Sequence, residues 1–379
     1  MDDGNCTNEV FYLDWSKQFN SEFPSWTDLT LNSGLDFKSC WATAVLNDDT
    51  IYLIGGIMDD QNNDDSFVSL LYAFNPKSGQ WNTPAIQGNK PERRRNVQAI
   101  ADDTRNIYVF GGKTDENLGS KIVQFFNDML ILNVNDLTWS YGPIANVPLK
   151  RDLYTASLLS DGRIVYIGGR EQYADNTQHE VDINQINLYD TKLASWSVMQ
   201  AKSDIQIDSR SSHTAVLVSD GRIIVYGGAR NALESRSDKV YPDLIVLNTQ
   251  TFEWIVPQVS SNIGEVPSLV SHTANLIDNY MMVAFGNITR PVAFPSAEHN
   301  SKIYLLDINN YTWVNDFVPA TSSGSSGSQS SKMKIIIGVI CGIVGLIIVL
   351  VVGIFSYKRY QKRKQNEVSS VDEKVTVKE

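Results

Sequence analysis

Histidine and cysteine are the residues of this chain with the greatest capacity for metal and redox chemistry. The 379-residue sequence has four histidines and three cysteines. Zinc and copper centres need such ligands at short, repeated spacings, and no CxxC or paired Cys/His spacing occurs. The residues are scattered along the chain: Cys6, Cys40, His179, His213, His272, His299 and Cys341. No P-loop or GxSxG motif is present either, so the sequence predicts no enzyme, no metal and no cofactor.

Adjacent carboxylates are the second candidate, at Asp59-Asp60 and Asp64-Asp65. Carboxylate oxygens are the ligands that calcium prefers in proteins. Acidic pairs in loops are more often simply solvated, so calcium is the alternative interpretation. We expect Asp59 and Asp60 to lie on a binding surface.

The overall charge restricts the class of partner. Asp and Glu number 43 and Lys and Arg 32, a net charge of −11. An acidic protein repels the phosphate backbone, which makes nucleic acid an unsuitable partner.

An uncharged run over residues 335–355, IIIGVICGIVGLIIVLVVGIF, predicts one transmembrane helix. Its 21 residues rise about 1.5 Å each, enough to cross a hydrocarbon core of roughly 30 Å. Five basic residues follow it closely: Lys358, Arg359, Lys362, Arg363 and Lys364. The positive-inside rule places the tail, 356–379, in the cytoplasm and the large body outside the cell or in a lumen. Gly338, Gly342 and Gly345 share one helix face and would allow a homodimer.

The N-terminus does not agree with export, because Met1 is followed by Asp2 and Asp3 and not by an apolar signal sequence. Either the sequence begins within a longer protein, which we favour, or the body faces the cytosol on an internal membrane. Sequons at Asn5, Asn287 and Asn310 permit export without requiring it. Cys6 and Cys40 can pair in an exported body or remain separate thiols.

The elements that must position all these residues form an internal repeat. Four apolar runs end in a diglycine, and a fifth run keeps only the second glycine. Successive copies lie 56, 57, 59 and 58 residues apart. The copies are Gly55-Gly56, Gly111-Gly112, Gly168-Gly169, Gly227-Gly228 and Phe285-Gly286. In each copy a tryptophan follows an Asn or Asp by six residues: Trp81, Trp139, Trp196, Trp254 and Trp313. Short runs rich in Ile, Val and Tyr between turn residues are typical of buried strands. Four strands per period of nearly 60 residues predict a β-propeller blade.

This pattern resembles the Kelch motif over nearly all of residues 5–317. Arg210-Ser-Ser-His213 and Ser271-His272 resemble the opening of a Kelch blade, which implies that these histidines belong to the framework. The plan of propeller, Ser/Gly linker (318–334), helix and basic tail is similar to single-pass fungal Kelch-repeat membrane proteins. The resemblance implies an all-β, galactose-oxidase-like propeller fold. Copper oxidases of that fold need paired histidines, and His179 and His299 lack such a spacing.

Residues 5–31 match the second half of a blade, because Val10–Asp14 resembles a third strand and Trp26 lies 29 residues before Gly55. We therefore expect five full blades plus an N-terminal half blade, and six blades in a complete chain. No segment after Trp313 is expected to supply the missing strands. The expected blades span about 36–86, 92–144, 150–201, 208–259 and 268–317.

Function is expected in the long, variable loops that follow the diglycines, since variable loops on a rigid scaffold are the usual place for binding. Arg93, Arg94 and Arg95 are expected on the same face as Asp59 and Asp60. The sequence thus predicts a membrane-anchored module that binds a protein or glycan. The alternatives are a cytosol-facing scaffold and an oxidase.

Overall fold

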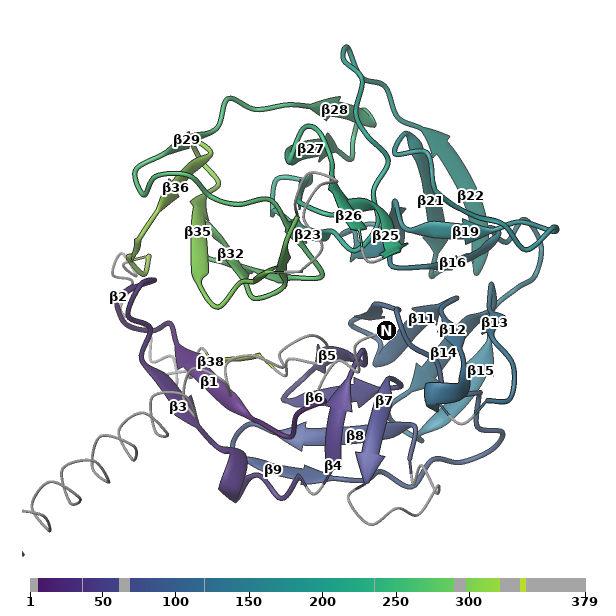
Figure 1. The fold of residues 1–379 in the computed structure, drawn as a ribbon. Helices are drawn as coiled ribbons and strands as arrows, with labels where there is room; N and C mark the ends of the chain where they lie inside the picture. Colours follow the sequence, from purple (N-terminus) through teal and green to yellow (C-terminus); the bar gives the residue numbers. More distant parts are fainter. Residues whose placement is uncertain are drawn as a thin grey trace, which may run out of the picture.

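The computed structural model describes residues 6–35, 37–60, 69–118, 120–234, 236–289, 298–320 and 335–338. These residues form small antiparallel sheets arranged around a central axis (Figure 1). Two short 3₁₀ helices interrupt them, η1 (Thr30–Asn32) and η2 (Glu116–Leu118). Within the described ranges, no helix combines the length and apolarity that crossing a membrane requires. The predicted all-β propeller is confirmed.

Five sheets contain the four strands of a full blade, in the order in which the strands follow along the chain. Blade 1 is β5 (Thr43–Asn47), β6 (Thr50–Ile54), β8 (Leu71–Asn75) and β9 (Gln80–Asn82). Blade 2 is β10 (Ala99–Ala101), β11 (Asn106–Phe110), β14 (Met129–Asn133) and β15 (Thr138–Tyr141). Blade 3 is β17 (Thr155–Leu158), β18 (Arg163–Ile167), β21 (Gln185–Asp190) and β22 (Ser195–Gln200). Blade 4 is β23 (Thr214–Leu217), β24 (Arg222–Tyr226), β27 (Leu244–Asn248) and β28 (Glu253–Ile255). Blade 5 is β31 (Thr273–Ile277), β32 (Tyr280–Ala284), β35 (Ile303–Asp307) and β36 (Thr312–Val314), and β29 (Ser260–Ser261) joins its outer edge.

The hydrophobic core lies between consecutive blades. Both faces of the middle strands are buried, which explains why they read as continuous apolar runs. Each repeat tryptophan of blades 2 to 5 packs into the core that its blade shares with the preceding one: Trp139, Trp196, Trp254 and Trp313. Burying such large side chains holds the blades face to face.

The diglycines make the closest contact between blades. All eight of these glycines have positive φ, a conformation that other residues adopt at a cost. The second N–H donates to a carbonyl of the next blade at 2.8–2.9 Å: Gly56 to Arg94, Gly112 to Arg151, Gly169 to Arg210 and Gly228 to Leu269. A Cβ on the first glycine would lie only 2.2–2.5 Å from the same carbonyl oxygens. The fifth copy has Phe285 there, with φ +63°, and its ring lies 6.3 Å from that of Phe11 in the half blade.

The chain does not become irregular after the diglycines. It forms a second set of short antiparallel ribbons, one at the diglycine end of each full blade. In three of these ribbons, one strand is the segment that leads into the first strand of the blade. The ribbons are β4–β7 (Phe37–Cys40, Ile57–Asp60), β12–β13 (Lys113–Thr114, Gln124–Phe125), β16–β19–β20 (Lys150–Asp152, Arg170–Gln172, Gln178–Glu180), β25–β26 (Ala229–Glu234, Arg236–Lys239) and β30–β33–β34 (Leu269–Val270, Asn287–Ile288, Glu298–His299). We call this end of the molecule the ribbon face.

The half blade closes the ring. Its strands β1 (Phe11–Asp14) and β3 (Trp26–Asp28) pair with each other. Between them, β2 (Phe19–Asn20) pairs with β37 (Asp316–Phe317) at the end of blade 5. On the other side, a disulfide joins Cys6 to Cys40 of blade 1. The half blade is therefore fastened to both of its neighbours.

The expectation that nothing after Trp313 supplies the missing strands is wrong at one position. Strand β38 (Ile335–Gly338) pairs antiparallel with β1, placing Ile335 opposite Asp14. Full blades place the first residue of the second strand opposite the turn Asn or Asp in the same way, as in Arg163 and Asp190. β38 thus occupies the place of a second strand. It covers the backbone edge of β1, which the half blade by itself would leave unpaired. The first four residues of the predicted helix are a strand here, and 339–355, with Gly342 and Gly345, lie outside the described residues.

His213 and His272 belong to the framework of the inner strands. Both are buried, and each ring Nε2 lies within hydrogen-bond distance of a threonine Oγ1 on the previous inner strand, 3.0 Å from Thr155 and 2.7 Å from Thr214. Burial lowers the pKa of His272 to about 3 and that of His213 well below its usual value. The folded protein therefore holds both rings neutral.

We expect alanine at Gly168 to destabilise the propeller far more than alanine at Gly264. Both have positive φ, but a Cβ at Gly168 would lie 2.5 Å from the Arg210 carbonyl oxygen, whereas Gly264 has open space. The conformational cost of about 1 kcal/mol is common to both variants, and overpacking adds about 1–3 kcal/mol at Gly168. Urea unfolding measures the difference, and equal losses would contradict the packing argument.

Acid should destabilise the fold through these histidines. The unfolded chain binds a proton near pH 6.5 while folded His272 does so only near pH 3, so stability is complete above pH 6.5 and falls as the pH drops toward 3. At pH 5 the loss from His272 is about 2 kcal/mol. Thermal melts of wild type and His272→Gln across pH 4–7 test this. The variant should show a shallower pH dependence, and parallel curves would contradict it.

Candidate binding site

The three arginines predicted on the binding face are used inside the structure. Arg94 is 3% exposed; it donates to the Gly111 carbonyl at 2.9 Å and to Asp128 at 2.6 Å. Its guanidinium also lies 4.0 Å from the centre of the Phe126 ring. Arg94 therefore ties the start of blade 2 to that blade's own diglycine turn.

Arg93 and Arg95 also interact with groups inside the propeller. Arg95 is buried, pairs with Asp115 and stacks 3.9 Å over the Trp41 ring. Arg93 donates to the carbonyls of both Gly55 and Gly56 at 3.3 Å, and burial lowers the pKa of its guanidinium. The prediction placed this run on the correct end of the propeller, but the guanidinium groups are occupied by carbonyls and carboxylates. They are not offered to a partner.

The acidic residues of the predicted face are described less fully. Asp59 and Asp60 lie on β7, opposite Lys38 and Phe37 of β4, and their side chains are outside the described part. Asp64 and Asp65 are outside it entirely. No group of three metal-ligating side chains occurs among the described residues.

A buried ionic network under the ribbons of blades 2 and 3 was not anticipated. Arg151 is fully buried and bonds Glu171 and, at 2.7 Å, Asn187. Arg170 pairs with Asp152 at 2.9 Å, with both side chains almost fully buried. The signal available in the sequence was the arginine near the start of blades 2 and 3, but the carboxylate partners of Arg95 and Arg151 lie twenty residues further along the chain, at Asp115 and Glu171. The Arg151–Glu171 and Arg170–Asp152 pairs both join β16 to β19 in the ribbon of blade 3.

The ribbon face also carries exposed apolar side chains. Ile122 and Val123 are each 64% exposed in the blade 2 loop, Tyr173 is 46% exposed on blade 3, and Tyr241 is 70% exposed on blade 4. Tyr241 is held at its backbone, where its N–H donates to Asp208 at 2.9 Å. Three consecutive blades therefore present aromatic or aliphatic groups from a fixed backbone.

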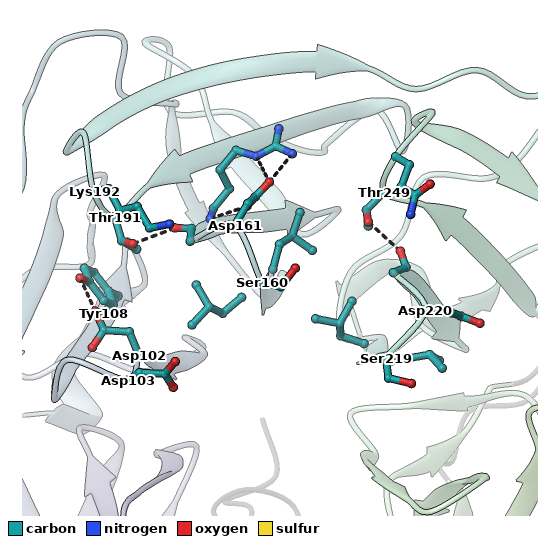
Figure 2. A pocket seen from close by; sticks show the side chains of 18 of the residues that line it. Asp102, Asp103, Tyr108, Ser160, Asp161, Thr191, Lys192, Ser219, Asp220 and Thr249 are labelled. Carbon is teal, nitrogen blue, oxygen red and sulfur yellow. Dashed lines mark hydrogen bonds and ion pairs between the residues drawn. The ribbon is translucent and has the colours of Figure 1, made fainter.

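A cavity opens at the opposite end, where the first and second strands of blades 2, 3 and 4 turn. It encloses about 1160 Å³. Figure 2 shows the turns that wall it, with Asp102 and Asp103 from blade 2, Asp161 from blade 3 and Asp220 from blade 4. This site was not predicted, because its walls come from turns about sixty residues apart along the chain.

Most of the acidic groups in this cavity already have partners. Asp161 pairs with Arg163 at 2.7 Å and Asp220 with Arg222 at 2.8 Å, and these hydrogen bonds lower the pKa of both carboxyls. Asp102 accepts a hydrogen bond of 2.9 Å from the hydroxyl of Tyr108 (Figure 2). The cavity can hold polar groups, but it shows no arrangement of nucleophile and base.

The remaining predicted residues are separate. His179 and His299 are exposed on the ribbons of blades 3 and 5, and within the described ranges neither belongs to a group of three metal-ligating side chains. Of the sequons, Asn310 is exposed in a turn, Asn287 is half-buried on β33, and Asn5 lies outside the described residues.

Comparison with known proteins agrees with this architecture. The family model described as "KLHDC2/KLHL20/DRC7 Kelch-repeats domain" matches residues 41–205 and 174–347, well over half of the chain. Kelch domain-containing protein 3 of Bos taurus is 27% identical over 214 residues, covering 56% of this chain and 52% of that protein. Kelch domain-containing protein 1 of Mus musculus is 26% identical over 267 residues, covering 65% and 62%. Host cell factor 2 of Homo sapiens is 25% identical over 231 residues, covering 57% and 27%.

The chain spans about half the length of the first curated relatives that it matches. The match covers the repeats, in which the diglycines, the tryptophans and the inter-blade hydrogen bonds recur. The chain belongs to the Kelch-repeat family.

Proposed function

We propose that this protein is a non-enzymatic recognition module whose ribbon face binds a partner protein. The observation that carries the proposal is the set of exposed apolar side chains on the ribbons of three consecutive blades: Ile122, Val123, Tyr173 and Tyr241. Exposed tyrosines on a fixed backbone are typical of binding hot spots, because they bury a large area at small entropic cost.

The buried arginines under the blade 2 ribbon also support this function. The arginines there are occupied by backbone carbonyls and carboxylates, so the exposed side chains stand on a preorganised surface. Binding to such a surface costs little ordering entropy. A protein partner is favoured over a glycan because two of the exposed apolar side chains, Ile122 and Val123, are aliphatic.

We further propose that residues 339–355, which continue the uncharged run after strand β38, anchor the propeller to a membrane, with the propeller outside the cell or in a lumen and the tail in the cytoplasm. The uncharged run and the basic residues that follow it support this topology. The disulfide between Cys6 and Cys40 supports an oxidising compartment, because thiols are kept reduced in the cytosol.

A photo-crosslinking residue at position 173 or 241 should capture a protein in cells that express the chain. The same residue at Lys192, which lines the cavity at the opposite end, should not. Purified chain carrying Tyr173→Ser and Tyr241→Ser should bind the captured protein at least tenfold more weakly, because two contact side chains are lost. Its unfolding midpoint should not change.

Tyr141→Ser is the matched control, because Tyr141 is 56% exposed on the outer strand β15, away from the ribbons. An equal loss of affinity in that variant would contradict the proposed surface. So would glycan binding that survives the double tyrosine substitution.

The compartment has its own test. Asn310 is exposed, so in an exported propeller it should carry an N-glycan. Asn310→Gln should then remove one glycosidase-sensitive step in electrophoretic mobility. A chain that carries no glycan at all in membranes of the expressing cell would favour the cytosol-facing scaffold.

A further inference from the structure

The outer strands of the five full blades differ in how their free edges are covered. In four of them, the outer edge hydrogen-bonds to a short arm from the blade that precedes it in the ring. The arms of blades 1, 3 and 4 pair in parallel, six residues after each tryptophan: Gln87 with Thr138, Lys202 with Glu253, and Ser260 with Thr312. For blade 1, the half blade covers the edge, where the Trp81 N–H donates to the Ser33 carbonyl at 2.9 Å.

The same two backbone groups hold each arm. One is the carbonyl of the positive-φ residue two places before the tryptophan: Leu137 accepts from Gln87, Phe252 from Lys202, and Tyr311 from Ser260, at 2.9–3.1 Å. The other is the N–H of the tryptophan itself, as at Trp254, which donates to Lys202 at 2.7 Å. The tryptophan N–H therefore points away from its own sheet.

Blade 3 has these groups but no arm. Ala194 has the positive φ of 46° and Trp196 follows it, yet within the fully described stretch 120–234 no backbone group pairs with either. The arm that should come from blade 2 contains Ala145, six residues after Trp139, in a turn with Asn146 at φ +55°. That turn leads the chain away from β22. Ile144 is consequently 88% exposed, whereas its counterpart Ile86 packs into the core between blades 1 and 2.

The uncovered edge is also the longest and has no charge. β22 has six residues, SWSVMQ, where the other outer strands have three or four. Val198 is 58% exposed and Leu193, just before the strand, is 75% exposed. Proteins normally protect such edges with charged residues, proline or a covering segment. Figure 1 shows β22 at the periphery of the ring, and β29 alongside β36 at the outer edge of blade 5.

We propose that β22 is a docking edge for an extended segment of another protein, which takes the place of the missing arm. The internal arms define the chemistry of that segment. It runs parallel to β22, donates one N–H to the Ala194 carbonyl and accepts from the Trp196 N–H, and carries uncharged or small side chains such as the Val-Ser-Ser of residues 259–261. A second copy of this chain is disfavoured, because two edges related by a twofold axis pair antiparallel and each copy has a net charge of −11. The edge lies apart from the ribbon face, so each proposal can fail without the other.

The probe is a nine-residue peptide, VPQVSSNIG, which copies Val256–Gly264, the arm that covers blade 5. Hydrogen exchange is measured on the full-length chain with and without it. In the unbound chain the Trp196 amide should exchange at least tenfold faster than the Trp254 amide, and the peptide should slow Trp196 tenfold without changing Trp254. Equal rates in the unbound chain, or no protection at millimolar peptide, would overturn the proposal.

Matched variants separate docking from general packing. Strand alternation places the Val198 N–H on the same outer side as that of Trp196, so Val198→Pro removes one outward donor and leaves the ladder with β21 intact. It should weaken peptide binding at least tenfold, as should N-methylation of the peptide at the residue equivalent to Ser260, while Val198→Thr should bind normally. Equal binding by the proline variant would overturn the proposal. A wild-type dimer in sedimentation that Val198→Pro abolishes would assign the edge to a second copy and overturn it too.

Discussion

The ring depends on the hydrogen bond from the second glycine of each diglycine to a carbonyl at the start of the next blade. Backbones approach so closely at this point that the first glycine has no room for a Cβ. The same contact sets the distance between sheets, so the large aromatic side chains on either side fill a gap of defined width. Arg93 and Arg94 reinforce it by donating to carbonyls of the glycine turns. The repeated glycines are therefore the consequence of one packing distance, and the inter-blade cores follow from it.

Where this contact is absent, the sequence departs from the repeat. Blade 5 faces the half blade, and among the described residues no backbone N–H or carbonyl of the half blade is paired with Phe285 or Gly286. Phe285 occupies the first glycine position there, and its ring contacts Phe11 and Trp26. The positive φ is retained even with a side chain, which indicates that the turn geometry and the inter-blade contact are separate requirements. The close contact between blades requires glycine, whereas the positive φ of the turn only favours it.

Much of the fold could be predicted because the repeat marks it. The diglycine and tryptophan spacings identify the middle and outer strands, and the position of His213 and His272 at the blade openings identifies them as framework. The direction of a side chain was not predictable, since Arg93, Arg94 and Arg95 look like a basic patch in the sequence and become buried through partners such as Asp128 and Asp115. The cavity walled by Asp102, Asp161 and Asp220 and the open edge of β22 both come from relations between blades. Only the geometry of the ring brings such positions together.

The closure of the ring affects how the whole domain can come apart. A linear array of repeats frays from its ends, because a terminal unit has one neighbour to lose. Here the unit that contains the first strands is fastened on one side through β2 and β37 and on the other through Cys6 and Cys40. A blade can then unfold only by disrupting its interfaces with both neighbouring blades. Closure of the ring therefore makes unfolding more cooperative than it would be in an open array. Cleaving the disulfide would weaken one of these attachments and shift the behaviour of the blades toward that of an open array, with unfolding that begins at the half blade.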